Sequence, residues 1–337
     1  QNHYKTFIKL LKESVQEGSI QMVRIDDAVA RILGVKYDLG LFDDPYGKPE
    51  YASYVGLMEH RQVARDAVRK SMVLLKNNSK VLPIAKDETI YVVGSGANNL
   101  GMQNGGWTVE WQGKMRPDFI ILDENSDGQV RLAELTRFYK NIYDSKYNSG
   151  GTEGNFKSMD KDSNGSLTLD EFNQFKVSAP FQPAGTSVLN AIKEAIGNTG
   201  SVIYDPRAKN LGSNSLVLAV VGEYPYAEGY GDNPDIGLSS FDIAVLERCY
   251  QSGNKIAVII FSGRPLIIRD HIDKWDALVA GWLPGMAGEG IADVLFGDYA
   301  PTGKLSFSWP KDILQLPLNF GESNYDPLFP FGFGLTY

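Results

Sequence analysis

The spacing of apolar residues divides the chain into a helical beginning and a longer part with a different pattern. Apolar side chains recur every three or four positions over residues 5–16 and again over residues 24–36, which predicts two amphipathic helices. Residues 39–54 are rich in Gly, Pro, Tyr and Asp and show no periodicity, as expected of a linker on the surface.

A second pattern starts near His60 and continues through the rest of the chain. A helix with Val63 and Ala67 on its apolar face is expected to include the apolar run 73–75, and a β-branched strand follows over residues 90–93. Buried apolar strands that alternate with helices indicate an α/β fold with a mainly parallel sheet, in which ligands bind at the carboxyl ends of the strands. The other strand-like runs are residues 216–221, 256–261 and 277–282, and helix-length segments include residues 241–250 and 289–296.

Residues 114–183 interrupt this alternation, because they are polar and rich in Asp, Asn, Ser and Gly. We interpret this segment as an inserted domain. It contains two loops, residues 123–134 and 160–171, that carry oxygen-bearing side chains at the same five loop positions and Gly at position 6. These side chains belong to Asp123, Asn125, Asp127, Gln129 and Glu134 in the first loop, and to Asp160, Asp162, Asn164, Ser166 and Glu171 in the second.

This spacing is the ligand pattern of an EF-hand calcium loop. Side-chain oxygens at positions 1, 3 and 5, a backbone carbonyl at position 7 and a bidentate Glu at position 12 surround one hard cation, while Gly at position 6 allows the sharp turn. The sequence therefore predicts a small all-α EF-hand insertion that binds two Ca²⁺ ions. Val130 and Leu167, both at position 8, can pair between the loops.

Two features of the insertion keep other interpretations open. Arg131 at position 9 of the first loop supplies no oxygen, so a water is expected to complete that shell. Pro117 leaves little room for an entering helix, a feature that is similar to dockerins, whereas Glu at position 12 of both loops favours an EF-hand. Further alternatives are an Asx-rich surface loop and a degenerate EF-hand that no longer binds metal.

Composition and charge exclude several classes of protein. With 43% hydrophobic and 22% charged residues the chain is globular, and it has no uninterrupted apolar stretch of membrane-spanning length. The formal net charge of −8 and the scattered basic residues argue against nucleic acid as a partner. Cys249 lies in an apolar helical run, so we expect a buried structural thiol, and a single Cys forms no internal disulfide.

Outside the insertion, a series of short motifs resembles family 3 glycoside hydrolases, most closely the plant and bacterial β-glucan exohydrolase branch. The resemblance covers nearly all residues outside 114–183. The motifs are RIDDAVARIL at residues 24–33, LGLF at 39–42, RKSMVLLKN at 69–77, GGWTVEWQG at 105–113, VGEYPYAEG at 221–229, SGRP at 262–265, WLPG at 282–285 and YDPL at 325–328.

The resemblance implies a TIM-like barrel that supplies a nucleophilic Asp, followed by a six-stranded α/β sandwich that supplies an acid/base Glu. The strand that carries the nucleophile has no match here. We therefore expect a fragment that is inactive alone and whose site is completed by the missing N-terminal barrel domain. The expected domains are residues 1–40 as the last helices of the (β/α) barrel, 41–61 as linker, 62–113 with 184–337 as the sandwich, and 114–183 as the insertion.

The same resemblance places the acid/base on Glu228, in the loop after the strand 216–221. A carboxyl group that leaves water for an apolar sugar pocket keeps its proton, because burial disfavours the charged form. Glu223, at the strand end, is the competing candidate and is expected to be a structural hydrogen-bond acceptor. Trp107 resembles the tryptophan that stacks on a sugar at the pocket entrance in this family, and Tyr226 is expected at the same mouth.

The implied activity is that of a retaining, exo-acting β-glucosidase or β-glucan glucohydrolase. Its substrates would be β-glucan or β-glucoside oligosaccharides with terminal β-D-glucosyl residues. A β-xylosidase of the same family and a non-catalytic, calcium-dependent binding or docking module remain alternatives. Glycan substrates, together with EF-hand-type modules that work at millimolar extracellular calcium, favour a secreted or periplasmic location.

Overall fold

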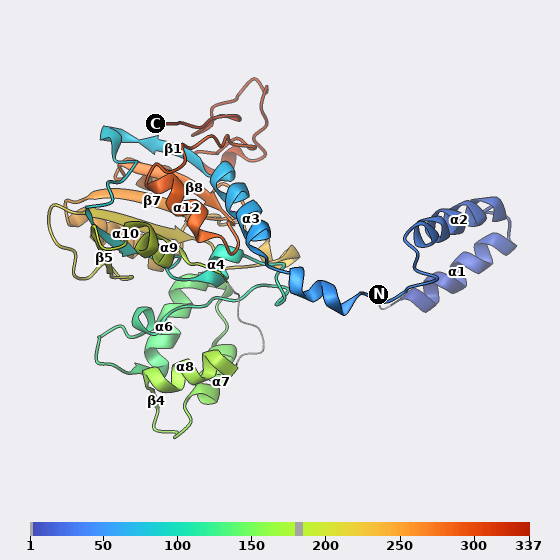
Figure 1. The fold of residues 1–337 in the computed structure, drawn as a ribbon, viewed down its shortest axis with the longest axis horizontal. Helices are drawn as coiled ribbons and strands as arrows, with labels where there is room; N and C mark the ends of the chain where they lie inside the picture. The colour runs from blue at the N-terminus through green and yellow to red at the C-terminus, as the bar shows by residue number, and fades with distance from the viewer. Residues whose placement is uncertain (1–2, 179–184) are drawn as a thin grey trace. The chain divides into compact units, whose positions relative to one another are not determined.

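The computed structural model describes residues 3–178 and 185–337. The chain divides into two compact units, Gln1–Leu57 and Met58–Tyr337 (Figure 1). Every residue singled out above for catalysis, sugar binding or metal binding lies in the second unit. In the part of the chain that is described, no helix combines the length and the apolar character needed to cross a membrane.

The first unit contains the two amphipathic helices that the spacing of apolar residues predicted. They are α1 (Tyr4–Gln16) and α2 (Met22–Asp38), and the short helix η1 (Pro49–Tyr54) follows. Neither α1 nor α2 has a buried side chain among the described residues. Phe7 of α1 is 65% exposed and Ile32 of α2 is 58% exposed, so the apolar faces of both helices are open.

The core of the second unit is a six-stranded sheet with the order β1-β8-β7-β6-β2-β5. All neighbouring pairs are parallel except β1 with β8, which confirms the predicted mainly parallel α/β sheet. β6 lies inside the sheet and is buried along its whole length. The strands are β1 (Val73–Asn77), β2 (Thr89–Val93), β5 (Ser201–Tyr204), β6 (Leu216–Gly222), β7 (Lys255–Phe261) and β8 (Ala277–Trp282).

The prediction that residues 73–75 continue a helix is wrong. Helix α3 (Met58–Ser71) ends before them, and they form the start of β1, where Leu74 pairs with Val279 of β8. Three consecutive buried apolar side chains suit a strand covered on both faces, whereas an amphipathic helix buries only one face. The pattern also missed β5, because this four-residue strand is only partly buried.

Helices pack on the sheet and on one another. α12 (Gly288–Leu295) packs against α3 and α9 (Val188–Ile196), and α10 (Ser240–Gln251) packs against β6. Arg65 of α3 donates a 2.6 Å hydrogen bond from Nε to Oδ2 of the buried Asp293 of α12, which ties these two helices together. The shorter helices are η2 (Asn78–Lys80), α4 (Leu100–Asn104), η4 (Glu228–Gly231), α11 (Arg269–Ile272) and η5 (Ile313–Gln315).

The insertion leaves the sandwich after α4 and is drawn in green in Figure 1. Its two loops meet in a short antiparallel ladder in which Val130 pairs with Leu167, as the sequence predicted, and both side chains are buried. The expected end of the insertion, residues 179–183, lies outside the described residues. Its elements are α5 (Phe119–Leu122), β3 (Val130–Arg131), α6 (Leu132–Tyr143), η3 (Asp144–Lys146), α7 (Ser149–Met159), β4 (Ser166–Leu167) and α8 (Leu169–Ser178).

Candidate active site

Two loops meet beside the carboxyl end of β6, one carrying Trp107 and the other carrying Glu228. The backbone N–H of Ala227 donates to Oε1 of Gln112 at 2.8 Å. At Gly106 the loops approach so closely that a Cβ atom would lie 1.9 Å from the carbonyl oxygen of Tyr226. Only Gly fits such a contact, so the Gly-Gly-Trp motif brings Trp107 next to the Glu228 loop.

Trp107 and Glu228 share a rare backbone conformation. The φ angle is +59° at Trp107 and +49° at Glu228, in the left-handed region that side chains other than Gly seldom adopt. The N–H of Trp107 donates to the carbonyl of Trp111 at 2.7 Å, which closes its loop. Both side chains are exposed on this chain, Trp107 to 66%. Strained, exposed residues of this kind are concentrated at functional sites.

Glu223 lies at the base of the Glu228 loop and accepts four hydrogen bonds. Its Oε1 accepts from Nε and Nη2 of Arg264 at 3.0 and 2.7 Å, and its Oε2 accepts from the hydroxyl groups of Tyr226 and Ser262 at 3.0 and 2.7 Å. Both oxygens of this carboxylate are used as acceptors for neighbouring side chains, which gives Glu223 a structural role. The expectation that Glu223 is a structural hydrogen-bond acceptor agrees with these contacts.

The charge on Glu223 also changes the titration of its partners. Burial opposes the charged form of Arg264, but the hydrogen bonds and charge of Glu223 outweigh it, so the pKa of Arg264 is raised. Burial, followed by the charge of Glu223, raises the pKa of Tyr226. The Tyr226 hydroxyl therefore stays protonated and is engaged with Glu223.

Asp242, at the start of α10, is fully buried. Its Oδ1 accepts from the N–H of Ser95 at 3.1 Å, and its Oδ2 accepts from the Ser95 hydroxyl at 2.7 Å and from the N–H of Gly222 at 3.3 Å. Burial raises the pKa of Asp242 to about 6, although these hydrogen bonds oppose the shift. Asp242 thus joins the carboxyl ends of β2 and β6, from which the candidate site extends.

Gln112 and Asp242 are parts of this site that reasoning from the sequence missed. Gln112 belongs to the GGWTVEWQG motif, and its closeness to Trp107 in the sequence was the only sign that it could contribute to the site. Asp242 is the third residue after Ser239, whose hydroxyl accepts from the Asp242 N–H at 3.2 Å, and in the sequence it resembled an ordinary residue of a helix start.

The second candidate metal loop, residues 160–171, brings three carboxylates together. Asp160, Asp162 and Glu171 each offer an oxygen within 4.8 Å of the others, the only such acidic cluster found where the chain is described. The N–H of Gly165 donates to Asp160 at 3.0 Å and the N–H of Thr168 donates to Glu171 at 2.9 Å, which orients both side chains. Hard oxygen ligands held in this way fit Ca²⁺.

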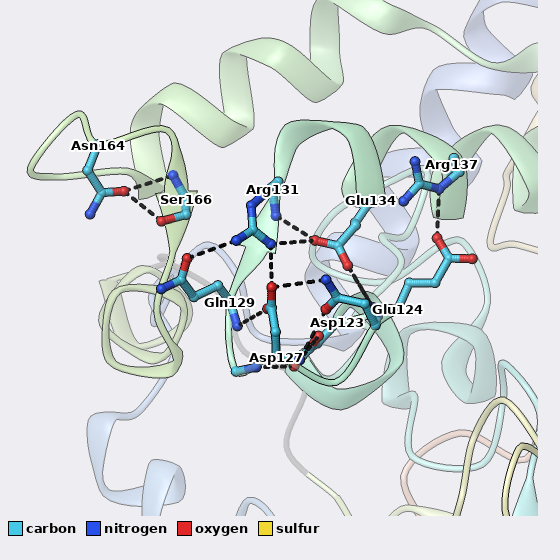
Figure 2. Close-up of polar contacts among 11 residues, drawn as sticks. Asp123, Glu124, Asp127, Gln129, Arg131, Glu134, Arg137, Asn164 and Ser166 are labelled. Atoms are coloured by element: carbon cyan, nitrogen blue, oxygen red, sulfur yellow. Dashed lines mark hydrogen bonds and ion pairs between the residues drawn. The ribbon is translucent and has the colours of Figure 1, made fainter.

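The first candidate metal loop, residues 123–134, has the same framework but also contains the positively charged side chain of Arg131 (Figure 2). Asp123 accepts from the N–H of Gly128 at 2.9 Å, and Glu134 accepts from the N–H of Arg131 at 2.9 Å. Nη1 of Arg131 lies 2.6 Å from Oδ2 of Asp127 and 4.0 Å from Oε2 of Glu134. The hydrogen bond from Arg131 lowers the pKa of Asp127. The guanidinium thus already pairs with Asp127, one of the expected ligands.

A family comparison identifies the sandwich. A model of the glycosyl hydrolase family 3 C-terminal domain matches residues 72–337. The chain belongs to glycoside hydrolase family 3. Its six-stranded sheet and the two loops at the end of β6 therefore lie within the C-terminal domain of this family.

Relatives and solved structures from the family match almost the whole chain. A periplasmic beta-glucosidase of Salmonella typhimurium is 28% identical over 98% of this chain and 42% of its own length. A beta-xylosidase of Formosa agariphila is also 28% identical, over 97% of this chain and 41% of its own length. An exo-1,3/1,4-beta-glucanase from a Pseudoalteromonas species is 32% identical with a TM-score of 0.73, over 99% of this chain and 36% of that one. A beta-glucosidase from Listeria innocua solved with glucose is 25% identical with a TM-score of 0.65, over 97% and 40%. The chain thus spans about two fifths of the length of the proteins it matches.

Proposed function

We propose that this chain is the acid/base-supplying part of a retaining, exo-acting β-glucosidase or β-glucan glucohydrolase. Its substrates are β-glucan or β-glucoside oligosaccharides, from which it releases terminal β-D-glucosyl residues. The observation that carries the proposal is the placement of Glu228, exposed and in a left-handed conformation directly beside the Trp107 loop. The names of the glucanase and beta-glucosidase structures support this substrate class.

In the proposed reaction Glu228 has two consecutive tasks. It donates its proton to the departing glycosidic oxygen, and it then removes a proton from the water that attacks the glycosyl-enzyme intermediate. Retention of configuration requires a second carboxylate about 5 to 5.5 Å away as nucleophile, which we assign to the barrel domain. Trp107 offers its flat indole face to the pyranose ring, and Tyr226 supports the loop between them.

We assign residues 1–40 to the last helices of that barrel, 41–61 to the linker, 62–113 with 184–337 to the sandwich and 114–183 to the insertion. The open apolar faces of α1 and α2 support the barrel assignment, because exposed apolar area of this kind is normally buried against a partner. The complete enzyme, as used below, is the protein in which the barrel domain joins this chain.

We propose that the insertion is an EF-hand pair that binds two Ca²⁺ ions. Its ligands are Asp123, Asn125, Asp127, Gln129 and Glu134 in the first loop and Asp160, Asp162, Asn164, Ser166 and Glu171 in the second, with Gln129 and Ser166 contributing backbone carbonyls. The converging carboxylates of the second loop support the proposal. Bound calcium would supply a structural crosslink between segments of the insertion.

Two further points follow from the relatives. The beta-xylosidase of Formosa agariphila keeps a xylosidase as the second candidate, because sugar choice depends largely on barrel residues. The name of the periplasmic beta-glucosidase of Salmonella typhimurium supports a secreted or periplasmic location, where millimolar calcium can load weak EF-hand-type sites.

The test of the proposed function is a leaving-group comparison in the complete enzyme. Glu228→Ala should lower activity on glucans by about 10² to 10⁴-fold, the usual contribution of a positioned general acid or base. Aryl glucosides with an acidic phenol need little protonation, so the formation of the covalent intermediate should be affected far less. An equal loss on both substrate classes would remove Glu228 from the acid/base role.

A further inference from the structure

Lys146 of the insertion contacts the Glu228 loop. Asp144 ends helix α6 with a φ angle of +45° and starts the short helix η3, which places Lys146 beside the loop. Nζ of Lys146 donates to the backbone carbonyls of Tyr230 at 2.8 Å and Asp232 at 2.6 Å. Tyr230 lies within the turn η4 that begins at Glu228, and Asp232 directly follows this turn.

A second cation holds the carbonyl between them. Nη2 of Arg264, from the loop after β7, donates to the carbonyl oxygen of Gly231 at 2.8 Å. Three successive carbonyl groups are thus held by two positively charged side chains, Lys146 from the insertion and Arg264 from the sandwich. Charge-assisted hydrogen bonds are about twice as strong as neutral ones, so this arrangement restrains the loop at the end opposite to Glu223.

The position of Lys146 is itself fixed by packing. The Ser240 hydroxyl at the start of α10 donates to Oδ1 of Asp144 at 2.8 Å, and the rings of Tyr143 and Tyr224 lie 4.8 Å apart between centroids. The rings of Phe138 and Phe241 lie 5.2 Å apart. The carboxyl end of α6 is therefore seated both on α10 and on the loop that leads to Glu228.

We propose that Lys146 is a positioning residue for Glu228, and that through it the insertion controls the acid/base step. The inference rests on the proposed role of Glu228. A left-handed Glu228 needs surroundings that hold it in place, and a displacement of about 1 Å at a catalytic group can cost about 10²-fold in rate. Glu134, the last expected ligand of the first loop, lies in the first turn of α6, and η3 with Lys146 directly follows this helix, so bound calcium would act on the segment that leads to Lys146.

The activity test uses the complete enzyme with Lys146→Met, Lys146→Arg and the control Lys140→Met, which alters an exposed lysine of the preceding helix α6. Lys146→Met should lower kcat/KM for glucans about tenfold while changing the rate of intermediate formation from acidic aryl glucosides less than about twofold. Lys146→Arg should restore most of the glucan activity, and Lys140→Met should change neither. Equal losses on both substrate classes would overturn the positioning role.

A second readout separates this inference from the role of Glu228. Amide hydrogen exchange of residues 228–232 should become faster in Lys146→Met and in the calcium-free protein, but not in Lys140→Met. Unchanged exchange in Lys146→Met would overturn the inference even if Glu228 is the acid/base. Faster exchange in Lys146→Met, together with a Glu228→Ala variant that shows no leaving-group dependence, would support the restraint of the loop by Lys146 and overturn the proposed role of Glu228.

Discussion

Gln112 and Ala227 connect the two halves of the candidate site: Oε1 of Gln112 accepts a 2.8 Å hydrogen bond from the Ala227 N–H, one residue before Glu228. This bond and the tight contact at Gly106 hold the loop that carries Trp107 against the loop that carries Glu228. The loops come from chain segments more than a hundred residues apart, so their contact is a product of the sheet order in which β2 lies next to β6.

Gly106→Ala should separate these loops. The new Cβ would meet the Tyr226 carbonyl at 1.9 Å, so one loop has to move, and we expect kcat/KM on glucans to fall about 10²-fold with little change in the melting temperature. The control is Gly154→Ala in α7, where nothing lies within 4 Å of the added carbon. Wild-type kinetics in Gly106→Ala would show that the distance between the loops is unimportant for turnover.

Asp242 should make stability depend on pH between about pH 4 and pH 7. Its folded-state pKa of about 6 is raised above the ordinary value of 3.8, so the folded state binds the proton more tightly than the unfolded state. The stabilisation is present in full below the unfolded pKa and is lost as pH rises through 6. The shift corresponds to about 3 kcal/mol.

Asp242→Asn removes this titration and provides the comparison. The difference in free energy of unfolding between variant and wild type should change in favour of Asn by up to about 3 kcal/mol from pH 4 to pH 7, measured by denaturant titration. A difference that stays constant over this range would contradict the raised pKa. The variant keeps the shape of the buried group, so cavity effects cancel to a large extent.

The two metal loops should bind calcium with unequal affinity. In the first loop the guanidinium of Arg131 forms an ion pair with the carboxylate of Asp127. The three carboxylates of the second loop converge without a basic side chain among them. Calorimetric titration should therefore resolve a tighter and a weaker step. Arg131→Gln should strengthen the weaker step about tenfold, because it removes the competing cation.

Arg137→Gln is the matched control for the calcium experiment. Arg137 donates to Glu124 at 2.6 Å, outside the ligand set but within the same loop region (Figure 2). This variant should leave both calcium affinities unchanged.

In the wild type, chelator should lower the melting temperature, because a ligand that binds only the folded state stabilises it. An unchanged melt with chelator would argue against calcium binding altogether.

The chain produced alone as residues 1–337 should not hydrolyse aryl β-glucosides. The proposed intermediate needs a nucleophilic carboxylate from the barrel, and Glu223, at the base of the Glu228 loop, is fully engaged by its four hydrogen bonds. The measurement is release of the phenol by purified chain with acidic aryl substrates. Turnover that survives purification and is lost in Glu228→Ala would contradict the assignment of the nucleophile to the barrel.

The sequence predicted the parts of this molecule that depend on local pattern. The continuous apolar runs located β6, β7 and β8, and the ligand spacing located two loops whose position-8 residues pair as expected. It failed at β1, because a short apolar run directly after a helix has no local feature that separates the two conformations. It also failed at Lys146, since a lysine in a polar segment looks solvated until tertiary structure places it on the Tyr230 and Asp232 carbonyls.

Azide should distinguish a missing general base from a damaged site in Glu228→Ala. With an acidic phenol as leaving group the first step proceeds, and the covalent intermediate accumulates because no base activates water. Azide is already anionic and needs no base, so it should restore turnover and give a β-glucosyl azide, which product analysis identifies. Glu223→Gln is the informative counterpart. It weakens the contacts to Arg264 and thereby the loop, so both substrate classes should lose activity and azide should restore neither. If the two variants exchanged these behaviours, Glu223 would be the acid/base and Glu228 its support.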